Sequence, residues 1–78
     1  MKEILETIIK NLVENADQVV ITEKEEEENH VVFEVKVTEK DLGKVIGKQG
    51  RIAKSIRTVM KSIAGKEHKK VSVEFIED

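Results

Sequence analysis

The sequence has no cysteine, no proline and only two aromatic residues among its 78 residues. Without cysteine the chain cannot form disulfides or thiolate metal sites, so its stability must come from the hydrophobic core, as in an intracellular protein. No hydrophobic run approaches the roughly 20 residues that a membrane-spanning helix needs, and the first residues do not resemble a secretory signal. We therefore expect a soluble, cytoplasmic protein that does not contact a membrane.

The chain is also short, which leaves room for a single domain over residues 1–78 and one thin core. His30 and His68 stand alone, without a second histidine or a cysteine at metal-ligand spacing. Ser55 and Ser72 have no candidate general base in a nearby motif. We therefore expect a protein that is not an enzyme and that needs no metal ion or other cofactor.

Charge is distributed unevenly along the chain. The formal net charge of −2 by itself argues weakly against a nucleic-acid partner. Residues 1–40, however, carry 5 basic and 11 acidic side chains, whereas residues 41–78 carry 9 basic and 5 acidic ones. Between Gly43 and Lys70 there are 9 basic side chains and 1 acidic one. This local excess predicts a basic binding surface that the total charge conceals.

Hydrophobic periodicity predicts both helices and strands. Apolar residues at helical spacing predict an amphipathic helix over residues 2–16. The acidic run 25–28 cannot be buried, so we interpret it as a solvated hairpin connection. β-branched residues and a period of two predict strands over residues 19–22, 31–37 and 71–75.

Two further helices are expected between the last two strands. Thr38 is the predicted N-cap of a short helix over Glu39–Ile46, with Asp41 as the acidic residue of a near capping box. A second helix is predicted from Arg51 to Gly65. The order α-β-β-α-α-β indicates a two-layer α+β domain, in which three helices cover one face of a three-stranded sheet.

The most informative segment lies between these two helices and reads Gly47-Lys48-Gln49-Gly50. A Gly-x-x-Gly sequence alone is weak evidence, because a tight corner between two helices also needs glycine. Here, however, glycines on both sides allow positive φ angles and let a polymer approach the backbone closely. The free amide groups at the start of the following helix suit a phosphate group.

Basic side chains in and after this loop would contact neighbouring phosphates. Lys48, Arg51 and Lys54 are the candidates, and their contacts would be sensitive to salt but not to base sequence. Arg57 and Lys61 lie roughly opposite the apolar side of their helix, where a solvated surface is expected anyway. For these two residues we favour a surface role without ligand contact.

With these features the chain resembles a K-homology (KH) domain, whose Gly-x-x-Gly loop clamps about four nucleotides. The element order is similar to the type II arrangement. Over nearly its whole length the chain closely resembles the small bacterial single-KH proteins of the KhpA type. The resemblance implies a groove for single-stranded RNA, or single-stranded DNA, in which residues 47–50 hold the backbone. It also implies a partly apolar floor for the bases, formed by Val45, Ile46, Ile52 and Ile56.

Proteins of the family that this chain resembles also act in pairs. The resemblance implies a homodimer, or a heterodimer with a larger bacterial protein that joins a KH domain to a second RNA-binding domain. It further implies a post-transcriptional regulator or an RNA chaperone. Neither Phe33 nor Phe75 is expected to stack on bases, because both face inward in their predicted strands. The alternative is a protein-interaction or dimerisation domain with little RNA binding, suggested by the aliphatic-rich helix over residues 52–63.

Overall fold

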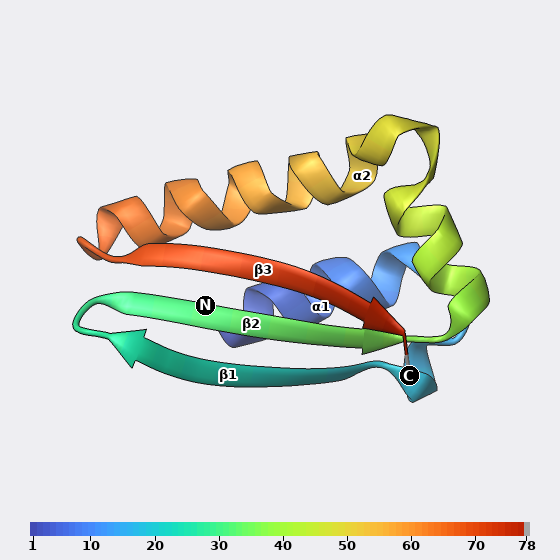
Figure 1. Ribbon diagram of the computed structural model, residues 1–78, viewed down its shortest axis with the longest axis horizontal. Coiled ribbons are helices and arrows are strands. Elements are labelled where there is room, and N and C mark those ends of the chain that lie inside the picture. The colour runs from blue at the N-terminus through green and yellow to red at the C-terminus, as the bar shows by residue number, and fades with distance from the viewer. Residues whose placement is uncertain (78) are drawn as a thin grey trace.

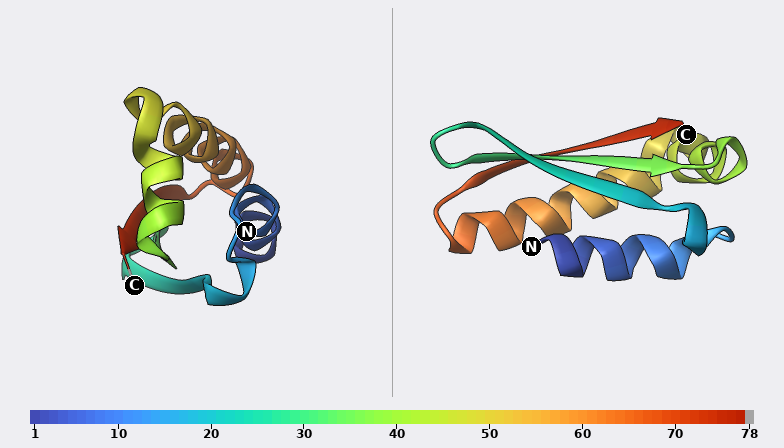
Figure 2. Two further views of the ribbon diagram at one scale, coloured as in Figure 1. Left: turned by 90° about the vertical axis from the view of Figure 1, so that its right-hand side faces the viewer. Right: turned by 90° about the horizontal axis from the view of Figure 1, so that it is seen from below.

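The chain forms a three-stranded sheet with helices packed on one of its faces (Figure 1 and Figure 2). The structure is a computed structural model that describes residues 1–77. The central strand β2 pairs antiparallel with β1 and parallel with β3. The two-layer α+β architecture predicted from the sequence is therefore confirmed. The elements in chain order are α1 (Lys2–Leu12), the 3₁₀ turn η1 (Ala16–Gln18), β1 (Val20–Glu27), β2 (His30–Val37), α2 (Glu39–Lys66) and β3 (Lys70–Glu77).

The first helix is shorter than the predicted span of residues 2–16, because it ends at Leu12. The backbone N–H groups of Glu14 and Asn15 donate to the carboxylate of Asp41, at 3.1 and 3.0 Å, instead of to carbonyl groups one turn earlier. A backbone donor that is held by a distant side chain cannot also continue the helix. Hydrophobic spacing could not reveal this partner, which lies in another element.

The first strand is longer than predicted and includes most of the acidic run. We expected residues 25–28 to form the hairpin connection, but Glu25 pairs with Val31 and Glu27 with His30. The turn itself contains only Glu28 and Asn29, and Asn29 has a positive φ of 64°. The glutamate side chains remain exposed on an edge strand, so the backbone can pair while the charges stay solvated.

The core lies between the sheet and the helices. Fully buried side chains come from α1 (Leu5 and Ile9), from β2 (Phe33 and Val35) and from α2 (Met60). The inward position predicted for Phe33 is confirmed. On the opposite face of the sheet, Val32 is also buried. It lies in the central strand, with Lys24 and Ser72 as its partners on the two neighbouring strands.

The C-terminus of α2 does not depend on Gly65, contrary to the sequence-based expectation. The helix continues to Lys66, and the residue with the left-handed conformation is His68, at φ 59°. The N–H of His68 donates to the carbonyl of Gly65, and the N–H of Lys69 to that of Ala64. This is a Schellman motif, which satisfies the last carbonyl groups of a helix. None of the helices among residues 1–77 is long and apolar enough to cross a membrane.

Candidate nucleic-acid interface

The Gly-x-x-Gly segment interrupts α2 and divides it into two helical segments, residues 39–46 and 51–66. Gly47 is extended, with φ −67° and ψ 173°, whereas Lys48, Gln49 and Gly50 are left-handed, with φ of 53°, 63° and 70°. The two segments meet at a sharp bend that projects from one end of the molecule (Figure 1). The predicted helix, loop and helix are therefore present.

The two glycines of the loop have different roles. Gly50 has a positive φ, where a Cβ is unfavourable, whereas Gly47 has an ordinary φ and does not use the conformational freedom that glycine allows. A Cβ added at Gly47 would meet no other atom within 4 Å. The fold itself therefore does not require glycine at this position. The missing side chain leaves bare backbone at the surface, where an external chain can approach.

Lys48 and Gln49 hold a conformation that their residue types disfavour. Left-handed backbone costs roughly 1–2 kcal/mol for each residue that carries a Cβ. Both side chains are exposed, and no hydrogen bond of either side chain is found within residues 1–77 that would compensate locally. Strained backbone of this kind is concentrated at functional sites. The loop is thus the strongest candidate for a binding element.

The first segment of α2 is anchored to the chain after α1. Thr38 caps the helix as predicted, since its hydroxyl accepts from the N–H of Asp41 at 3.2 Å. The Asp41 side chain, which is only 1% exposed, does not complete the capping box. Its carboxylate instead accepts from the backbone of Glu14 and from both the backbone and side-chain N–H groups of Asn15. Burial alone would raise the pKa of Asp41, but these hydrogen bonds outweigh it and hold the pKa below its usual value.

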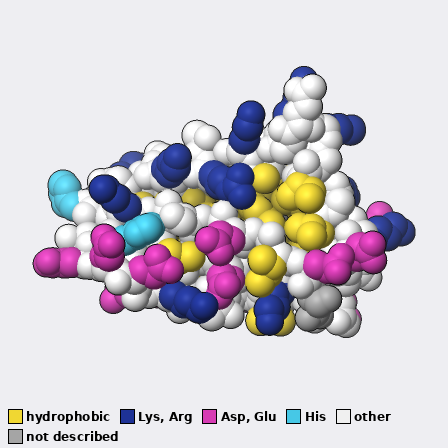
Figure 3. All heavy atoms as spheres, viewed as in Figure 1, with side chains coloured by type: hydrophobic (Ala, Val, Ile, Leu, Met, Phe, Trp, Pro, Cys, Tyr) yellow, Lys and Arg dark blue, Asp and Glu magenta, His cyan; other side chains and the backbone are white. Residues whose placement is uncertain are grey.

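The predicted phosphate-binding cations are exposed and free of carboxylates. Lys48 lies in the loop, and Arg51 and Lys54 follow in the second segment. In the part of the chain that the structure describes, ion pairs involve Lys10, Lys24 and Lys40, but none of the nine basic residues between Gly43 and Lys70. Figure 3 shows Lys and Arg side chains along α2, with most of the acidic side chains lower, over the strands. The basic segment predicted from the sequence therefore forms an exposed, positively charged surface along α2.

The four residues predicted for the apolar floor are divided between core and surface. Val45 and Ile56 are 1% and 3% exposed and belong to the core, so neither offers surface to a ligand directly. Ile46 is 50% exposed and immediately precedes Gly47, and Ile52 is half-buried just after the loop. Ile52 and Ile56 also line a groove beside α1, with Ile56 at its buried floor.

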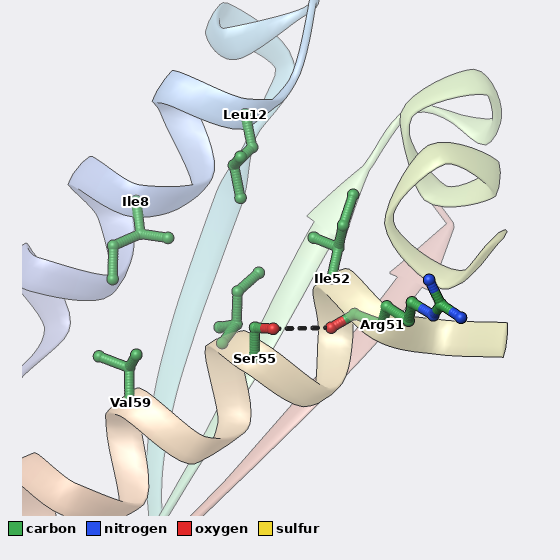
Figure 4. Close-up of a pocket in the computed structure, with 7 residues that line it drawn as sticks. Ile8, Leu12, Arg51, Ile52, Ser55 and Val59 are labelled. Carbon is green, nitrogen blue, oxygen red and sulfur yellow. Dashed lines mark hydrogen bonds between the residues drawn. The ribbon is translucent and has the colours of Figure 1, made fainter. Parts of the chain in front are cut away.

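A groove that sequence reasoning missed runs between α1 and the second segment of α2. It encloses about 290 Å³ and is lined almost entirely by aliphatic side chains. Figure 4 shows Ile8 and Leu12 on α1 facing Ile52 and Val59 on α2. Helical spacing predicted an amphipathic helix over residues 2–16, but only the relative position of the two helices opens the groove.

A second groove lies on the other side of α2, against β3, and encloses about 290 Å³. Here Arg57 differs from our expectation of a purely solvated side chain. Its Nε donates to the carbonyl of Val73 at 3.0 Å, and its guanidinium lies over the ring of Phe75, 5.5 Å from the centroid. Among residues 1–77 we find no cluster of His, Asp and Glu that could hold a metal ion.

The family model described as KhpA/KhpB, KH domain matches residues 2–75. The chain belongs to this KH-domain family. Two relatives, each named RNA-binding protein KhpA, come from Clostridium acetobutylicum and Clostridium perfringens, and each is 55% identical over 97% of this chain and 100% of its own length. A third, from Aquifex aeolicus, has the same name and is 48% identical over 99% of this chain and 96% of its own length.

Membership of the KhpA/KhpB family agrees with the resemblance seen in the sequence. The relatives are named as binding proteins and not as enzymes, in keeping with the expectation that this chain has no catalytic activity. No solved structure matches the chain significantly. Membership of the family therefore rests on sequence similarity.

Proposed function

We propose that the chain is a non-catalytic protein that binds single-stranded RNA, whose backbone lies over residues 47–50. The conformation of the loop carries this proposal. Lys48 and Gln49 are held exposed in left-handed backbone beside Gly47, and the second segment of α2 begins directly after them, where the first amide groups of a helix suit a phosphate. The KhpA relatives are named as RNA-binding proteins, which supports RNA as the ligand.

The surrounding side chains support the same ligand. Lys48, Arg51 and Lys54 provide positive charge that no carboxylate within residues 1–77 neutralises. Ile46 and Ile52 provide apolar surface on either side of the loop, while Val45 and Ile56 are buried in the core. Single-stranded DNA offers the same phosphates, so the 2′-hydroxyl decides between the two ligands.

The proposal is tested by the double substitution Lys48→Asp and Gln49→Asp. Carboxylates then occupy the place of the phosphate, so retention of single-stranded RNA is expected to be lost. Because aspartate tolerates left-handed backbone better than most residues, thermal unfolding should remain nearly unchanged. The matched control is Lys2→Asp with Gln18→Asp, which makes the same chemical change at exposed positions outside α2. If the loop variant binds RNA with wild-type affinity, the proposed site is wrong.

We further propose that the protein acts in pairs, as a homodimer or with a larger KH-containing RNA-binding protein. One loop that contacts about four nucleotides gives modest affinity, and two linked sites raise it. The groove between α1 and α2 supplies an apolar contact surface, in which Val59 is 43% exposed. Such pairing suits a post-transcriptional regulator or an RNA chaperone.

Sedimentation of the Val59→Asp variant tests the pairing. A carboxylate in the apolar groove should convert dimers to monomers, whereas Thr58→Asp, at the adjacent exposed position, should not. Identical sedimentation of the wild type and both variants would contradict this use of the groove. Stable dimers that ignore oligonucleotides of every composition at low salt would instead favour the alternative, a protein-interaction domain with little RNA binding.

A further inference from the structure

Arg57 is held in a defined position on the side of α2 that faces β3. Its Nε donates to the carbonyl of Val73, and its guanidinium lies 5.5 Å from the centroid of the Phe75 ring. Two contacts from one strand thus fix a side chain that is otherwise long and mobile. The residue nevertheless remains exposed, so its side chain is accessible to a ligand.

This position lies next to the proposed backbone site. Lys54, Arg57 and Lys61 are spaced three and four residues apart, so they form one row along α2. The row begins with a proposed phosphate contact, and Arg57 lies about 9 Å along the helix axis from Arg51. The groove beneath the row is lined by Arg57, Lys61, Val71, Ser72 and Val73.

The chain has few other groups on which a base can stack. Phe33 is fully buried, and the ring of Phe75 is half-buried beneath Arg57. The chain contains no tyrosine or tryptophan. A guanidinium plane can take the place of an aromatic ring in stacking on an unpaired base. The arrangement of Phe75 below and Arg57 above therefore offers a platform that the composition alone does not reveal.

We propose that Arg57 stacks on one nucleobase of the bound strand, with Phe75 as the support beneath it. The inference rests on the proposed RNA-binding function. It adds a side chain that contacts a base, whereas the loop contacts only the backbone of the strand. The same two contacts also have a purely structural interpretation, in which Arg57 only covers the edge of β3. The two interpretations predict different behaviour toward RNA that lacks a base.

The test uses short RNAs of about four nucleotides in which each position in turn carries an abasic ribose. For the wild type, removal of the stacked base should weaken binding about fivefold at one position. In the Arg57→Lys variant, which keeps the charge but loses the plane, the penalty at that position should disappear. Penalties at the other positions should persist. Phe75→Leu, which removes the support, should reduce the same penalty.

Arg51→Lys is the matched control, because it makes the same change at a proposed phosphate contact. It should weaken binding to intact and abasic RNA by the same factor. If Arg57→Lys keeps the wild-type penalty at every position, the stacking role is overturned, whatever its effect on overall affinity or thermal stability. In that case, loss of binding in the double variant Lys48→Asp and Gln49→Asp would still support RNA binding at the loop. A wild-type protein that binds none of these RNAs would overturn both.

Discussion

Gly47 and Gly50 bracket the loop, but only one of them is required by the backbone. Gly50 has φ 70°, whereas Gly47 has φ −67° and open space where a Cβ would lie. The sequence predicted the position of the loop and its two glycines, because both lie between helical patterns. It could not predict that Lys48 and Gln49 take left-handed backbone, since neither residue type favours it. The left-handed residues lie where the two helical segments of α2 meet.

A pair of alanine substitutions separates the two glycines. Gly50→Ala should lower the free energy of unfolding by about 1 kcal/mol, because its positive φ disfavours a Cβ. Gly47→Ala should leave stability unchanged or raise it by about 0.4–1 kcal/mol, since alanine restricts the unfolded chain. RNA affinity should nevertheless fall in Gly47→Ala, because the new methyl group lies where the strand approaches. Chemical denaturation and fluorescence anisotropy measure the two effects, and wild-type affinity of Gly47→Ala would contradict close approach at this residue.

At the scale of elements, Asp41 connects the end of α1 to the start of α2. The sequence predicted the cap at Thr38 correctly, because the capping residue and its target are three positions apart. It assigned residues 13–16 to the first helix incorrectly, because the competing partner of Glu14 and Asn15 is 26 or 27 positions away. Sequence patterns over a few residues predict hydrogen bonds between near neighbours, but not bonds to a distant element. The groove between α1 and α2 was missed for the same reason, since it depends on how two distant helices pack.

The Asp41 carboxylate makes stability depend on pH. Its pKa is lower in the folded than in the unfolded chain, so its contribution is complete above the unfolded pKa, about 3.9, and is lost as the pH falls through the folded pKa. Asp41→Asn should therefore lower the Tm at neutral pH, and the difference from the wild type should shrink below about pH 4. Thermal unfolding across this range measures it. The control Asp17→Asn removes an exposed carboxylate and should change the Tm little; an Asp41→Asn difference that is constant with pH would contradict this role.

At the scale of the whole molecule, opposite charges are separated by the fold. Most of the basic residues between Gly43 and Lys70 lie on α2, whereas β1 carries four glutamates and one lysine (Figure 3). The charge count along the chain predicted this separation, because one long element contains most of the basic segment. The sequence did not predict that β3 would hold Arg57 in place. That contact depends on how β3 packs against α2 after pairing in parallel with β2.

The central claim is that single-stranded RNA lies over residues 47–50, and an NMR titration of the isotope-labelled protein tests it most directly. With short single-stranded RNA at low salt, the largest changes in backbone amide resonances should occur in residues 47–51. Smaller changes are expected along the side of α2 that faces β3. Resonances that do not move at all, or changes confined to α1 and β1, would contradict the claim.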